Sequence, residues 1–129
     1  LVFAGLKSQE EYILKNEETY RVFKYINENS PPEAKVWVVY EPRTFYCDRP
    51  YVTFLRLGGV SSAEEFLAQL KKAGITHFVF NQGLWQVRYG EQSKYPELIE
   101  KIKPEYLDTV YEKDSFVIWR LSYPSGLIE

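Results

Sequence analysis

The chain has 129 residues, and its 16 Lys and Arg against 18 Asp and Glu give a formal net charge of -2 at pH 7. This length corresponds to one domain, and the charge excludes the broad basic face that nucleic-acid binding requires, so we expect no nucleic-acid partner. Cys47 is the one cysteine and His77 the one histidine, so the sequence predicts no intrachain disulfide and no metal centre.

The chain contains no Met and begins at Leu1, so we expect a fragment or a processed product. Its opening residues, LVFAGL, are apolar but much shorter than the about 20 residues that span a bilayer. They also lack the basic start and the cleavage site of a signal peptide. We assign residues 1–7 as a linker or the end of a membrane-proximal segment, which is either the stub of a membrane helix or an arm that packs on the core.

A long helix is predicted over Ser8–Asn29, with Ser8 as its N-cap and the pair Pro31-Pro32 beyond its end. Five residues fall near one face of this helix at helical spacing: Tyr12, Asn16, Tyr20, Phe23 and Ile26. The next segment, Val36–Tyr40, is a continuous apolar run rich in β-branched residues. Such a run is typical of a strand that is buried on both faces.

A strand–helix–strand unit follows, with strands at Tyr51–Leu55 and Thr76–Phe80 and a helix at about Ala63–Ala73. Gly74 stands where a left-handed C-terminal cap is expected. Two pairs fit a capping box at the start of the helix: Ser61 with Glu64, or Ser62 with Glu65. The spacing predicts a βαβ unit with a right-handed crossover.

The remaining elements complete the sheet. A polar and aromatic loop spans residues 81–94, and a short helix begins at Tyr95 and ends at Lys103-Pro104. Two strands, Leu107–Tyr111 and Phe116–Leu121, then flank a hairpin turn.

Together these elements predict a single α/β domain over residues 8–122, followed by a tail at residues 123–129. The expected fold is a three-layer α/β/α sandwich. Its sheet is mixed and mostly parallel, has about five strands and closes with the C-terminal antiparallel hairpin.

The order of these segments resembles the extracytoplasmic C-terminal domain of GT-C-fold multi-pass membrane glycosyltransferases. These are the enzymes akin to dolichyl-phosphate-mannose protein mannosyltransferases and bacterial aminoarabinose transferases. The resemblance covers most of Tyr25–Asn81 and, more weakly, the closing hairpin. The segments that carry it are Tyr25–Pro32, Ala34–Val36, Arg43–Tyr46, Asp48–Val52 and Leu70–His77.

The resemblance implies a parent enzyme that moves a sugar from a polyprenyl-phosphate carrier to an acceptor outside the cytoplasm. In that family the catalytic carboxylate lies on a loop between early transmembrane helices, often with a divalent metal nearby. No part of this chain matches that loop, so no catalytic residue and no cofactor are carried over. The resemblance therefore implies a non-catalytic accessory domain on the periplasmic or extracellular face, with its own transmembrane domain and the lipid-linked sugar or acceptor as partners.

Arg43, Asp48 and Arg49 form the first candidate substrate-binding group. We expect them beyond the carboxyl end of the first strand, where ligands bind in open α/β sheets. Two guanidinium groups there can hold a phosphate or carboxylate in bidentate fashion. The alternative, which we favour, is that Asp48 pairs with one arginine and braces the loop.

Trp85, Arg88 and Tyr89 form the second candidate substrate-binding group. A loop with two such aromatic rings can stack on a sugar or rest at a membrane interface. Equally, Trp85 can fold back as an anchor for its own loop. In the segment Gly58–Ser62 we favour a turn with a capping box over a phosphate cradle, because no phosphate-binding motif is present. His77, within an apolar strand, is expected to be a structural histidine that donates to the backbone.

Two other functions stay open. One is a stand-alone soluble protein that binds a nucleotide or a sugar phosphate at Gly58–Ser62. The other is a protein-interaction module that uses the loop around Trp85. The ordered set of matching segments, together with the absence of a complete catalytic constellation, favours the accessory domain.

Overall fold

The structure is a computed structural model of the 129-residue chain. It describes residues 6–39, 44, 46–53, 55, 59–82 and 95–126, of which residues 6–16, 95 and 96 are described by their backbone alone. The elements are, in chain order, α1 (Leu6–Asn29), β1 (Val36–Val39), β2 (Tyr51–Val52), α2 (Ala63–Ala73), β3 (His77–Asn81), α4 (Tyr95–Tyr106), β4 (Leu107–Lys113) and β5 (Phe116–Leu121).

The five strands form one mixed sheet in the order β2-β1-β3-β5-β4. Strands β2, β1 and β3 are parallel to one another, and β5 is antiparallel to both of its neighbours. The α/β fold with a closing antiparallel hairpin is thus confirmed. The apolar run of β1 is buried at every position, as is β3, because helices cover both faces of these strands.

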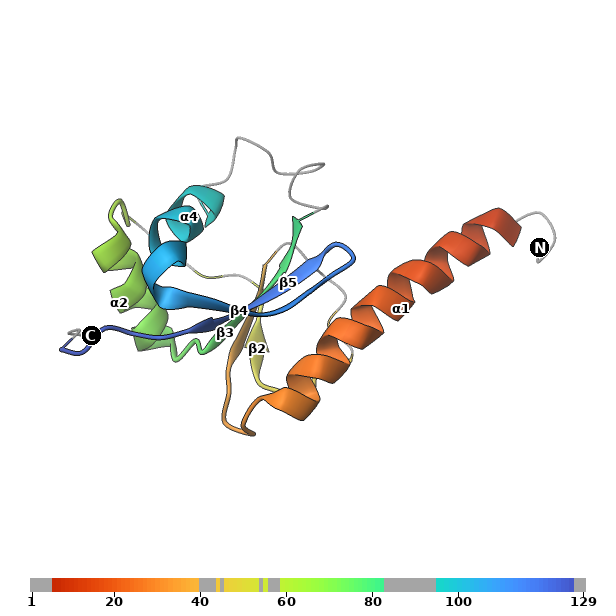
Figure 1. Cartoon of the computed structure of the whole chain (residues 1–129), viewed down its shortest axis with the longest axis horizontal. Helices are drawn as coiled ribbons and strands as arrows, with labels where there is room; N and C mark the ends of the chain where they lie inside the picture. Colours follow the sequence, from red (N-terminus) through yellow and green to blue (C-terminus); the bar gives the residue numbers. More distant parts are fainter. Residues whose placement is uncertain are drawn as a thin grey trace.

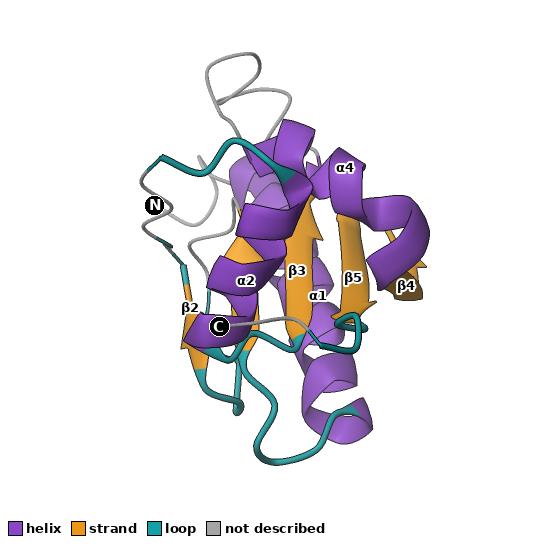
Figure 2. Ribbon diagram, turned by 90° about the vertical axis from the view of Figure 1, so that its left-hand side faces the viewer, coloured by secondary structure: helices purple, strands orange, loops and turns teal. Residues whose placement is uncertain are grey.

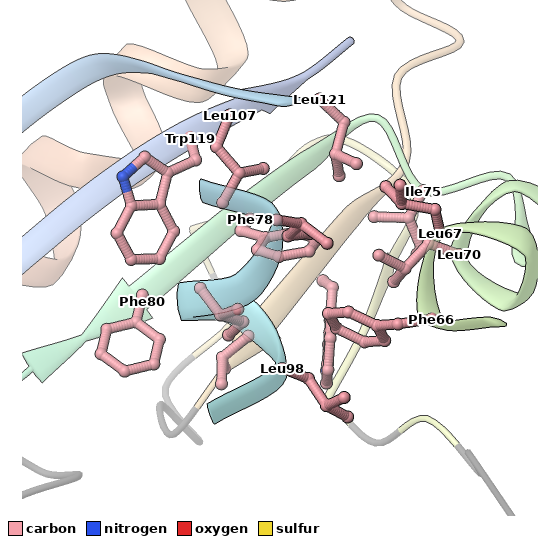
Figure 3. Close-up of a cluster of buried hydrophobic side chains, with 14 of the residues drawn as sticks. Phe66, Leu67, Leu70, Ile75, Phe78, Phe80, Leu98, Leu107, Trp119 and Leu121 are labelled. Atoms are coloured by element: carbon pink, nitrogen blue, oxygen red, sulfur yellow. The ribbon is translucent and has the colours of Figure 1, made fainter. Parts of the chain in front are cut away.

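Helices lie on both faces of the sheet (Figure 2), and the sheet separates the core into two layers of side chains. Helices α2 and α4 cover one face, where Trp37, Phe66 and Phe78 pack together. Helix α1 covers the other face, where Phe23 meets the second set of strand residues, among them Val38 and Ile118. Alternate residues of each strand point to opposite faces, so every central strand contributes to both layers. Figure 3 shows the layer beneath α2 and α4.

Only the C-terminal part of α1 packs on the sheet, and the helix projects beyond the sheet toward its N-terminal end (Figure 1). The buried residues of this part are Thr19, Val22, Phe23 and Ile26. The predicted face was therefore partly wrong, because Tyr20 lies beside this stripe and is 46% exposed. The prediction of Ser8 as the N-cap was also wrong, since the helix already begins at Leu6.

Helix α2 begins and ends where the sequence predicts, because both of its caps are local. The hydroxyl of Ser62 accepts a hydrogen bond from the backbone N–H of Glu65 at 3.1 Å and donates to the Glu65 carboxylate at 3.2 Å. Gly74 adopts φ 78°, and the N–H of Ile75 reaches back to the carbonyl of Leu70 at 3.0 Å. Ser62 with Glu65 is therefore the capping box, and Gly74 is the left-handed cap.

Other predicted boundaries were wrong. Helix α4 continues through Pro104 to Tyr106 and passes directly into β4. A proline in the last turn keeps a helical φ and costs mainly one hydrogen bond, while Ile102 and Leu107 on either side of it are buried. Strand β2 has two residues rather than the five predicted.

A residue of the predicted tail belongs to the packed domain. Tyr123 packs against the layer beneath α2 and α4, and its hydroxyl donates to the carbonyl of Ile75 at 2.6 Å. The ordered packing therefore extends past residue 122.

We predict that Gly74→Ala lowers the free energy of unfolding by about 1 kcal/mol, because an L side chain is strained at this positive φ. Steric conflict adds little, since an added Cβ lies 3.9 Å from its nearest neighbour, Lys35 Cδ. Urea unfolding measures the effect. Gln69→Ala, at an exposed position within the same helix, should leave the stability nearly unchanged, and an equal loss in both variants would contradict the left-handed cap.

Candidate functional site

An open groove of about 370 Å³ lies between α1 and the segment formed by residues 46–50. Four of its lining residues, at positions 20, 24, 27 and 28, come from α1, where spacings of three and four residues place side chains on one helix face. The other lining residues come from the segment. The complete lining is Tyr20, Lys24, Asn27, Glu28, Tyr46 and Asp48.

The side chain of Asn27 fastens the segment to α1. Its Nδ2 donates to the carbonyl of Tyr46 at 2.9 Å, and its Oδ1 accepts from the backbone N–H of Asp48 at 2.8 Å. The side-chain amide of Asn27 thus pairs with a backbone acceptor on one side of Cys47 and with a backbone donor on the other. This pairing fixes the distance between the two walls of the groove.

Arg49 makes the second attachment, at the C-terminal end of α1. Its Nη2 donates to the carbonyl of Asn27 and, at 2.9 Å, to the carbonyl of Ser30, while Nε contacts the Ser30 hydroxyl at 3.2 Å. The last carbonyls of a helix lack partners within the helix and carry partial negative charge. The guanidinium therefore acts as a cap for α1 through Nε and Nη2.

The groove carries aromatic and charged side chains side by side. The rings of Tyr20 and Tyr46 meet edge to face, with centroids 5.2 Å apart and an interplanar angle of 86°. Lys24 and Glu28, one helical turn apart, form no ion pair with each other or with Asp48 in the part of the chain that the structure describes. The groove therefore presents one ammonium and two carboxylates next to an aromatic pair.

The structure places the first predicted site group differently from the sequence. Asp48 and Arg49 lie at the opposite end of the sheet from the one predicted, because Val36 at the start of β1 donates to the carbonyl of Pro50 at 2.9 Å. Strand β2 is parallel to β1, so the segment before it must return to the amino end of β1. Arg49 pairs with the helix carbonyls and not with Asp48. Arg43 lies outside the described residues.

The second predicted group, Trp85, Arg88 and Tyr89, lies entirely outside the described residues. So does Gly58, in the segment considered as a phosphate cradle. At the other end of that segment the Glu65 carboxylate and Ser62 already occupy the start of α2. A bound phosphate would have to compete with this carboxylate for the positive end of the helix.

His77 is 6% exposed and lies on the α1 face of the sheet, beside its parallel partner Val36. Its Nδ1 is 2.8 Å from the hydroxyl of Thr76, so its ring pairs with a side chain rather than with the predicted backbone carbonyl. Burial lowers the pKa of His77, and Arg120, opposite it on β5, lowers it further. The ring is therefore neutral at pH 7 and holds a structural position.

Cys47 lies between two residues that line the groove, Tyr46 and Asp48. Burial raises the pKa of the half-buried Cys47 thiol, which disfavours the reactive thiolate. Within the described ranges there is no group of three or more His, Cys, Asp or Glu side chains that could hold a metal ion. None of the helices described in the structure is both long and apolar enough to cross a membrane. Comparison with protein-family models and with curated protein sequences gave no match.

The groove residues that sequence reasoning missed are those on α1. Tyr20, Lys24, Asn27 and Glu28 share one face, but nothing in their local pattern separates them from an ordinary solvated surface. Asn27 gave one weak signal: it stands near the end of a helix, where an amide competes with the backbone for hydrogen bonds. Its partners, however, lie 19 and 21 residues away along the chain.

We predict that Asn27→Ala lowers the free energy of unfolding by about 1–3 kcal/mol, because it removes two hydrogen bonds to backbone groups of the segment. Hydrogen exchange should accelerate most at the amide of Asp48, which loses its acceptor. Asn29→Ala is the matched control, since Asn29 makes one exposed bond within α1, to the carbonyl of Tyr25. If both variants behave alike, Asn27 does not hold the segment.

The lowered pKa of His77 predicts a pH dependence of stability. The unfolded state, with a pKa of about 6.5, binds more protons than the folded state just below that pH. The free energy of unfolding should therefore have its full value above pH 6.5. It should fall as the pH drops below that value, by at most about 1.4 kcal/mol per pH unit. Urea unfolding between pH 7.5 and about 5.5 measures this slope.

His77→Gln should flatten that slope, and Arg120→Gln should raise the pKa of His77 in an NMR titration, because it removes a like charge. An unchanged slope in His77→Gln would assign the effect to other groups.

Proposed function

We propose that this chain is a non-catalytic accessory domain of an integral-membrane glycosyltransferase that uses a polyprenyl-phosphate-linked sugar. It acts on the extracytoplasmic face of the membrane and holds an acceptor or a donor near the membrane-embedded active site. Its contribution is positioning, which lowers the entropic cost of bringing two reactants together. Its partners are its own transmembrane domain and the lipid-linked sugar or the acceptor.

One observation carries the proposal: two segments of the resemblance form a single bonded unit. The helix end Tyr25–Pro32 and the segment Asp48–Val52 are joined by Asn27 and Arg49 through three hydrogen bonds to backbone groups and one to the Ser30 hydroxyl. Asn27 also donates to the carbonyl of Tyr46, which belongs to a third segment of the resemblance. Matching segments that were scattered over the surface would give the resemblance little support. Their convergence on one groove supports a resemblance in architecture.

The projecting α1 fits such a role. A helix of 24 residues is about 36 Å long, and its N-terminal end lies well away from the sheet (Figure 1). A chain that enters through this helix is connected rigidly to the groove, because the same helix forms one groove wall. The groove is thus held at a set place relative to the N-terminal end of α1.

The rival function of nucleotide binding has less support. It requires the start of α2 to accept a phosphate, and that position is closed by the capping box of Ser62 and Glu65. The rival function of a protein-interaction module rests on Trp85, which lies outside the described residues. The accessory domain therefore remains the function that the site supports best.

Three experiments test the proposal. The coding sequence upstream of Leu1 should encode several apolar segments of about 20 residues each. When the complete protein is assayed in membranes for transfer of a labelled sugar from a polyprenyl-phosphate donor, Asn27→Ala should raise the KM for donor or acceptor, while the control Asn29→Ala should not. The 129-residue chain alone should transfer no sugar. Transfer by the chain alone, or an upstream sequence without apolar segments, would refute the proposal.

A further inference from the structure

The aromatic wall of the groove offers a fixed, accessible ring face. Tyr20 is 46% exposed although it contacts the ring of Tyr46. The edge-to-face contact restrains the Tyr20 ring, and Asn27 in turn restrains the backbone of Tyr46. A tyrosine ring that is held in place gives a large apolar contact area at low entropic cost. A flat apolar ligand face, such as the C–H face of a pyranose, is the natural complement.

The charges around this ring select the class of ligand. Lys24, Glu28 and Asp48 line the groove, and no hydrogen bond or ion pair within the described ranges uses any of these three side-chain heads. A phosphate or carboxylate would face two carboxylates, and a simple cation would face the ammonium of Lys24. A neutral polyol avoids both conflicts, because each hydroxyl donates to a carboxylate and accepts from an ammonium.

The size and rigidity of the groove agree with such a ligand. Its volume of about 370 Å³ lies in the range of small-molecule sites, and it suits one or two sugar rings. The Nδ2 donor and the Oδ1 acceptor of Asn27 both bind the segment, so the floor of the groove is already ordered before a ligand arrives. A site that is ordered in advance loses less free energy on binding.

We infer that this groove is a saccharide-binding site that takes the neutral sugar rings of a ligand and not a phosphate. The inference rests on the proposed function and narrows it: the domain holds sugar, and the charged head of a carrier binds elsewhere. Tyr20 supplies the stacking face. Glu28 and Asp48 accept hydrogen bonds from sugar hydroxyls, and Lys24 donates one.

The test is an NMR titration of the ¹⁵N-labelled 129-residue chain. The probes are methyl α-D-mannopyranoside, methyl α-D-glucopyranoside and maltose, with inorganic phosphate and glucosamine as charged comparisons. At least one neutral sugar should produce saturable shifts at the amides of Asn27, Tyr46 and Asp48. No shift with any neutral sugar up to about 50 mM, or saturable binding of phosphate or glucosamine alone, would overturn the inference.

Variants distinguish the contribution of the Tyr20 ring from that of the charged side chains around it. Tyr20→Ala should weaken sugar binding by about tenfold or more, a change of about 1.4 kcal/mol, whereas Tyr20→Phe keeps the ring and should retain most of the affinity. Lys24→Ala should weaken binding, and Lys101→Ala on α4, where Lys101 pairs with Glu97, is the matched lysine control. Circular dichroism and thermal melting establish that each variant is folded. Equal affinity in Tyr20→Ala and the parent chain would also overturn the inference.

The two proposals can fail separately. If the chain binds sugar in the groove but the upstream sequence encodes no apolar segments, the groove stands and the accessory function falls. Suppose instead that the complete membrane protein transfers sugar, and that Asn27→Ala raises its KM, but that the chain shows no sugar binding. The accessory function then stands and the saccharide site falls.

Discussion

The backbone directly after α1 cannot supply hydrogen-bond donors to the last carbonyls of the helix, and this constraint shapes the site. The last carbonyls of a helix need donors, but Pro31 and Pro32 have no backbone N–H to offer. The Ser30 hydroxyl serves one carbonyl, that of Ile26, and Arg49 serves those of Asn27 and Ser30. A side chain 22 residues beyond Asn27 along the sequence thus becomes part of the helix end.

This distant cap ties three parts of the fold together. Arg49 precedes Pro50, whose carbonyl accepts from the first amide of β1, and Tyr51 then pairs with Val36 in parallel register. The helix end, the returning segment and the first strand pair are therefore one connected structure. The groove lies on this structure, so its walls keep their spacing without a large interface of their own. Asn27 adds the last restraint, from within the helix.

The sequence was sufficient to predict those elements whose boundaries depend on residues nearby along the chain. The boundaries of α2 follow from Ser62 and Gly74, and the strand Phe116–Leu121 follows from the apolar run Phe116–Trp119 and the turn before it. Where long-range packing decides, the predictions were wrong. Helix α4 extends past Pro104 because buried residues flank it, and Tyr20 falls outside the buried stripe because the sheet meets α1 along a neighbouring face.

The candidate site was predictable only in part for the same reason. Asp48 and Arg49 were recognised as notable, but their location depends on the parallel pairing of β2 with β1. Local pattern does not reveal which strands pair, so the return of the segment to α1 could not be predicted from it. The α1 wall of the groove, with Lys24 and Glu28, has no motif at all. It becomes visible only once the segment is seen to lie against it.

The charges at this end of α1 are themselves informative. No basic residue occupies the last turn of the helix, and Glu28 places an anion at the negative end of the dipole, an arrangement that costs about 0.3–1 kcal/mol. Glu28 and Asp48 line the same groove, which adds like-charge repulsion. Arg49 places a positive charge at this helix end through its bonds to the carbonyls of Asn27 and Ser30, but Glu28 and Asp48 form no ion pair in the described part of the chain. Charged side chains without an ion-pair partner are a local departure from favourable electrostatics of the kind found at binding sites, because such carboxylates remain available to the hydroxyls of a ligand.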